Sequence, residues 1–158
     1  MAMHCRQHLG GHYGNALQAA SCGGHESVVQ LLLENGADVN AQGGRYGNAL
    51  QAASDGGHES VVQLLLKNGA DVNAQGGHYG NALQAASCGG HGSVVQLLLK
   101  NGADGNAQGG HFGNALQAAS DGGHESVVQL LLKNGADVDA QGGHYGNALQ
   151  AASDGGSI

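Results

Sequence analysis

The sequence has no proline and no tryptophan, and aromatic residues make up only 3% of its 158 residues. Large rings therefore cannot fill the interior, which must be built from alanine, valine and leucine. Basic residues are also scarce: five Lys and Arg stand against twelve Asp and Glu, which excludes a basic surface for nucleic acid or an anionic membrane. No apolar run approaches the roughly 20 residues that cross a bilayer, and the first residues, MAMHCRQHL, lack the apolar segment of a secretory signal.

Glycine is abundant instead, and its 31 residues recur at fixed places in a repeat of 33 residues. A fixed period of this length indicates stacked supersecondary units rather than one globular core. The predicted organisation is a lead at 1–9, full repeats at 10–42, 43–75, 76–108 and 109–141, and a truncated fifth repeat at 142–158.

Each repeat contains the pattern of two short helices, as the second copy illustrates. The first helix is predicted at 49–55, with Asn48 as its N-cap and the Gln51 side chain completing a capping box. The second is predicted at 59–67, where apolar residues recur at three- and four-residue spacing, and Gly69 supplies its left-handed end. Helices this short do not persist alone in water, so each must pack against the next repeat. The pattern therefore predicts an all-α solenoid.

The segment GHESVVQLLLKNGADVNAQ, residues 57–75, resembles the second helix and following loop of ankyrin repeats. The family's first-helix signature, threonine-proline-leucine-histidine, here reads Asn48-Ala49-Leu50-Gln51. Gln51 would thus have to supply any hydrogen bond of the family's histidine. The GGxYGNALQAAS stretch is similar to ankyrin arrays of fungal intracellular (NACHT/NLR-like) receptor proteins. The resemblance implies a curved stack of helix pairs with projecting hairpin fingers, which binds another protein and is not an enzyme.

Several positions that differ between copies fall in slots that the family uses for binding. The finger slots hold His12 and Tyr13, Arg45 and Tyr46, His78 and Tyr79, His111 and Phe112, and His144 and Tyr145, and the slot ending the first helix holds Cys22, Asp55, Cys88 and Asp121. The resemblance implies two partner-binding ladders on the concave face. The aromatic residues have an alternative role in packing each finger against the next. The His/Arg slot is predicted to be exposed, because arginine tolerates burial poorly.

Ten histidines and three cysteines raise the alternative of a metal-binding protein. Ladder rungs about 10 Å apart could not share one zinc ion. Only the lead, with His4, Cys5, His8 and His12, could hold a divalent ion on one helix face, and no metal or cofactor is expected. Cys22 and Cys88 lie two repeats apart, too far for a disulfide, so the cysteines are expected to be free thiols in a reducing compartment.

The sequence thus favours a non-catalytic module for an unidentified protein partner, the recognition part of a larger cytoplasmic or nuclear protein. A change in affinity between about pH 5 and 7 is expected as exposed imidazoles gain charge. The alternative is a self-associating solenoid, joined through the C-terminal end where Leu149 lacks a covering helix. The histidines of the GH dipeptides (His25, His58, His91 and His124) are interpreted as structural. Gly92 and Gly105 make the third repeat the predicted weak point.

Overall fold

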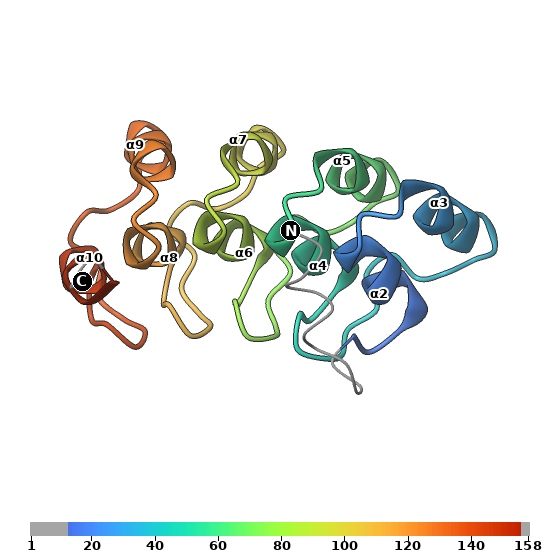
Figure 1. Cartoon of the computed structure of the whole chain (residues 1–158), viewed down its shortest axis with the longest axis horizontal. Coiled ribbons are helices and arrows are strands. Elements are labelled where there is room, and N and C mark those ends of the chain that lie inside the picture. Colours follow the sequence, from blue (N-terminus) through green and yellow to red (C-terminus); the bar gives the residue numbers. More distant parts are fainter. Residues whose placement is uncertain (1–12, 156–158) are drawn as a thin grey trace.

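The computed structural model describes residues 13–155, which form paired helices and no extended strand. The first helices of the repeats are α2 (Ala16–Cys22), α4 (Ala49–Asp55), α6 (Ala82–Cys88), α8 (Ala115–Asp121) and α10 (Ala148–Gly155). The second helices are α3 (Glu26–Glu34), α5 (Glu59–Lys67), α7 (Gly92–Lys100) and α9 (Glu125–Lys133). Figure 1 shows the first helices as a middle row, with the second helices on one side and the finger loops on the other. The predicted all-α solenoid is confirmed.

The helix ends of the second repeat coincide with those predicted from the sequence, because the capping residues act locally. Asn48 is extended, and its Oδ1 accepts from the backbone N–H of Gln51 at 2.8 Å. The second half of the predicted capping box is wrong. The Gln51 side chain is fully buried beside Gly47, and neither its Nε2 nor its Oε1 has a hydrogen-bond partner. The packing of the finger on the first helix draws this amide inward, away from the Asn48 backbone.

The histidine of the GH dipeptide joins each repeat to the one before it. The Nε2 atom of His58 lies 2.8 Å from the carbonyl oxygen of Cys22, where it donates to the end of α2. His91 and Asp55 repeat this contact at 2.8 Å. Gly57, at φ 71°, leaves room for it, because a Cβ there would lie 2.5 Å from Nδ1 of His91. The histidines are structural, as interpreted, but their hydrogen bond crosses the repeat boundary instead of closing their own loop.

A second link between repeats comes from the asparagine in the loop after each second helix. The Nδ2 group of Asn40 donates to the Gly69 carbonyl at 3.1 Å, and its Oδ1 accepts from the Asp71 backbone N–H at 2.8 Å. Asn73 and Asn106 make the same pair of bonds to the repeats that follow them. One side chain therefore satisfies two backbone groups of the next repeat, and it sets the spacing of these loops.

The two unusual glycines of the third repeat leave the backbone unchanged. Gly92 begins a full-length α7, and neither Gly92 nor Gly105 has a positive φ. A Cβ added at either position would meet no atom within 4 Å. Both positions can thus accept the Glu and Val found in other copies.

We expect Gly92→Glu and Gly105→Val each to raise the free energy of unfolding by up to about 1 kcal/mol, measured by urea denaturation. The reason is the lower backbone entropy of the unfolded chain and, at 105, an added apolar contact. Gly102→Ala is the matched control: it has equal space, but its φ of 92° should make the change cost about 1 kcal/mol. A loss of stability in Gly92→Glu would show that the third repeat is not weakened by this glycine.

The His58 contact also predicts how stability depends on pH. Burial lowers the pKa of His58 in the folded chain below the value of about 6.5 that an unfolded histidine has. The unfolded state therefore binds more protons as pH falls through about 6.5, and the stability provided by neutral His58 is lost there. Thermal unfolding between about pH 7.5 and 5 should show a falling melting temperature. His58→Gln keeps a donor without a titrating group, so its curve should be flatter; an equally steep curve would contradict this assignment.

Candidate functional site

The fingers are tight hairpins that hydrogen-bond directly to one another. In the second repeat the backbone N–H of Gly43 donates to the Gly47 carbonyl at 2.9 Å. The N–H of His78 donates to the Arg45 carbonyl at 2.8 Å, and that of His111 donates to the His78 carbonyl at 3.0 Å. His144 and His111 continue this series at 3.0 Å. Adjacent fingers are thus joined as neighbouring β-strands are, and such strands lie about 4.8 Å apart.

The finger tips carry a row of cationic and imidazole side chains, which we call the His/Arg row: Arg45, His78, His111 and His144. The ring centroids of His78 and His111 lie 5.1 Å apart, and those of His111 and His144 lie 5.0 Å apart, with near-parallel planes. The predicted rung spacing of about 10 Å is therefore wrong, because it is typical of packed helix bodies and not of hydrogen-bonded fingers. His111 and His144 are exposed, while Arg45 and His78 are half-buried.

Metal binding has no support in residues 13–155, where no group of three or more His, Cys, Asp and Glu side chains could hold an ion. The predicted set in the lead (His4, Cys5, His8 and His12) lies outside the described residues, and so does the role of His12 in the His/Arg row.

An aromatic row lies against the His/Arg row and is formed by Tyr13, Tyr46, Tyr79, Phe112 and Tyr145. Successive centroids are 6.3–6.5 Å apart. The rings of His78 and His111 each meet their neighbouring aromatic ring edge-on at 5.0 Å. Tyr46, Tyr79 and Phe112 are 0%, 4% and 6% exposed. This burial favours the packing alternative and corrects the prediction that these three rings contact a partner.

The slot that ends each first helix forms an Asp/Cys row behind the aromatic rings. The Tyr79 hydroxyl donates to the carboxylate of Asp55, and the Tyr145 hydroxyl donates to that of Asp121, in each case 24 residues further along the chain. Phe112 stands 24 residues after Cys88, so the hydroxyl is missing where the carboxylate is missing. Comparison of equivalent slots alone missed this pairing, whose signal is the joint change of two positions in neighbouring repeats.

The pKa values follow from this arrangement. Burial, followed by the charge of Asp55, raises the pKa of Tyr79 well above its ordinary value. Burial raises the pKa of the Cys88 thiol to about 12, and Asp55 and Asp121 add to the effect. Cys88 therefore stays protonated at neutral pH and is a poor nucleophile. The pKa of Tyr145 is raised mainly by its hydrogen bond to Asp121.

The predicted free thiols are correct for Cys88 and wrong for Cys22, which is disulfide-bonded. The sequence argument considered only pairing between these two, which does not occur. Cys22 is fully buried and Asp55 is 7% exposed. Neither presents a surface to a partner in this structure, whereas Cys88 and Asp121 are half-buried.

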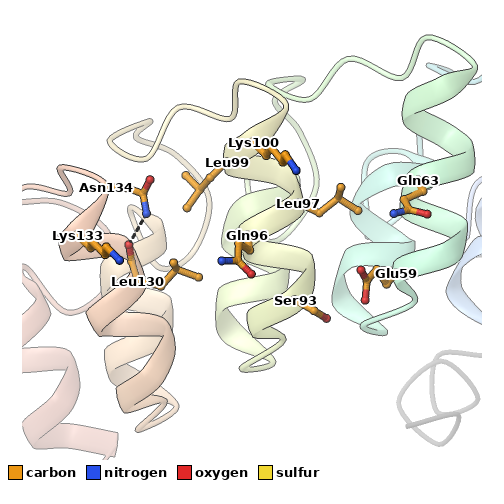
Figure 2. Close-up of a pocket in the computed structure, with 10 residues that line it drawn as sticks. All are labelled: Glu59, Gln63, Ser93, Gln96, Leu97, Leu99, Lys100, Leu130, Lys133 and Asn134. Carbon is orange, nitrogen blue, oxygen red and sulfur yellow. Dashed lines mark hydrogen bonds between the residues drawn. The ribbon is translucent and has the colours of Figure 1, made fainter.

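The opposite face carries a groove between α5, α7 and α9, with a volume of about 730 Å³. Figure 2 shows Leu97 and Leu130 within it, with Lys100 and Lys133 at one end. Together with Lys67, these lysines form an exposed lysine row along the ends of the second helices, where a cation complements the helix dipole. The structure therefore has two basic rows, one on the fingers and one on the second helices.

A third exposed surface lies at α10. Leu149 is 78% exposed, whereas its equivalent Leu116 is 3% exposed. Leu132 and Val138, at 41% and 58%, lie beside it around a hollow of about 320 Å³. The surface is apolar, as predicted for the C-terminal end.

The pairing across repeats predicts the effect of Tyr79→Phe. Loss of the donor to a largely buried carboxylate should lower the free energy of unfolding by about 1–3 kcal/mol, measured by urea denaturation. Phe112→Tyr should give no gain, because Cys88 offers no carboxylate. Combined with Cys88→Asp it should cost less than the sum of the two single changes, by about 1 kcal/mol. Strict additivity would show that the two positions are not coupled.

Comparison with known proteins places this fold. The family model described as "Ankyrin repeats (3 copies)" matches residues 3–76 and again residues 77–142. A stretch of 29 residues is 76% identical to the azaphilone pigments biosynthesis cluster protein L of Monascus ruber, and it covers 18% of this chain and 6% of that protein. No helix among residues 13–155 is long and apolar enough to cross a membrane. The chain belongs to the ankyrin repeat family, a non-catalytic fold whose arrays generally serve as protein–protein interaction modules.

Proposed function

We propose that this chain binds a protein partner through its fingers, with the His/Arg row as the contact surface. The observation that supports this is the combination of spacing and exposure: polar rings 5.0–5.1 Å apart stand on a buried aromatic row. The aromatic row and the paired Asp–Tyr bonds hold the His/Arg row in place. A partner then meets a preformed surface and loses little conformational entropy on this side of the interface.

Of the residues predicted to bind, the proposal keeps those with accessible side chains. These are Arg45, His78, His111, His144, Cys88 and Asp121, together with the half-buried end rings Tyr13 and Tyr145. Arginine and ring side chains suit such a surface because they combine contact area with polar groups. We further propose that the array is the recognition part of a larger cytoplasmic or nuclear protein. The disulfide at Cys22 favours oxidising surroundings instead, so thiol counting on protein isolated from cells tests the compartment.

The test is affinity capture with two matched variants of the full chain. One carries Arg45, His78, His111 and His144 changed to Ala, and the other carries Lys67, Lys100 and Lys133 changed to Ala. A partner retained by the native chain and the lysine variant, but lost by the finger variant, is the expected result. Circular dichroism must show that the finger variant keeps its helices. Loss in the lysine variant alone would move the site to the opposite face.

Self-association is the second candidate, and the apolar surface at α10 favours it. A heterologous contact between this surface and another copy would build open chains of molecules. It would be preferred if neither variant differed from the native chain in capture and light scattering gave masses above that of a monomer.

A further inference from the structure

The His/Arg row cannot spread when it gains charge, because backbone bonds fix it. The N–H of His111 donates to the His78 carbonyl at 3.0 Å, and the N–H of His144 donates to the His111 carbonyl at the same distance. The rings stand 5.0–5.1 Å apart with interplanar angles of 18° and 19°. Protonation of neighbouring imidazoles therefore places like charges about 5 Å apart, at a spacing set by the backbone. Such a row is stable in its charged form only with anions beside it.

The described part of the chain does not supply those anions to the exposed rungs. His111 and His144 form no ion pair within residues 13–155. The titratable groups behind the row are already engaged with one another. Tyr79 donates to Asp55 and Tyr145 donates to Asp121, while the Cys88 thiol stays protonated between the two carboxylates. Asp154, at the end of α10, also faces Tyr145. These carboxylates lie on the first helices, behind the aromatic rings.

Arg45 shows that the finger slot accepts a permanent cation. It occupies the same position as His78, and its carbonyl accepts the hydrogen bond that begins the series of fingers. Its Nε is buried and has no hydrogen-bond partner. The row therefore starts with one fixed charge and continues with imidazoles, whose charge changes in the physiological range.

We propose that the His/Arg row binds a carboxylate-rich segment of a protein, and that protonation of the imidazoles controls this binding. The proposal rests on the fingers being the binding surface and adds the chemistry of the partner. By linkage, a ligand that favours the protonated row binds more tightly as pH falls, and it raises the affinity of the imidazoles for protons. The carboxylates of the ligand would lie between successive rings and screen their repulsion.

The probe is a poly-L-glutamate peptide, whose binding to the full chain is measured by calorimetry at about pH 7.5 and about pH 5.5. We expect affinity to increase roughly tenfold at the lower pH, which is the order expected of three exposed ion pairs. Added salt should weaken the binding at the lower pH. Equal affinity at both values, or no binding at the lower pH, would overturn the proposal.

Three variants separate the His/Arg row from other charged groups. H78Q/H111Q/H144Q keeps polar side chains without titration, and it should lose the pH-dependent increase. H78R/H111R/H144R copies Arg45 along the row, and it should bind tightly at both pH values. K67Q/K100Q/K133Q removes the lysine row of the opposite face, and it should behave like the native chain.

Each variant can also contradict the proposal. A pH-dependent increase that persists in the glutamine variant, or disappears in the lysine variant, places the effect elsewhere. An arginine variant that melts at the native temperature but binds weakly at about pH 7.5 excludes charge as the cause. The failure of this test leaves the capture experiment at neutral pH unaffected, so a finger surface for a partner of other chemistry would still be recognised there.

Discussion

The hydrogen bond between the backbones of successive fingers determines the shape of the array. It brings the rings of His78, His111 and His144 to 5.0–5.1 Å from one another, whereas packed helices are separated by roughly 8–10 Å. A stack that is short along the fingers and long along the helices must curve, and the second helices lie on the longer side (Figure 1). The same constraint therefore compresses the finger surface and opens the groove between α5, α7 and α9 (Figure 2).

Polar side chains provide most of the directional contacts between repeats. The histidine of the GH dipeptide bonds to the end of the preceding first helix, the loop asparagine bonds to the following loop, and tyrosine hydroxyls bond to aspartates of the preceding repeat. Each of these contacts satisfies a group that would otherwise be buried without a partner. The apolar core supplies the attraction between repeats, and these bonds fix how one repeat is placed on the next.

Features determined within one repeat were predictable from the sequence. The bounds of α4 and α5, the Asn48 cap and the left-handed Gly69 follow from local rules, and the structure reproduces them. Features determined between repeats were not. The inward position of the Gln51 amide, the finger spacing and the burial of Tyr46 depend on how neighbouring units approach one another. The exposure of His111 followed from Arg45 in the same slot, whereas the disulfide of Cys22 has no counterpart in the repeat pattern.

The bond from His58 to Cys22 spans 36 residues, and the bonds of Asn40 span 29 and 31. All of them reach the adjacent repeat and none reaches further. Removal or insertion of one whole unit would therefore recreate every junction from the remaining copies. Near-identical copies are also favourable substrates for unequal crossing-over in the gene. The number of rungs can then change in one generation without loss of the fold, and selection can adjust the valency of the finger surface by copy number before any side chain changes.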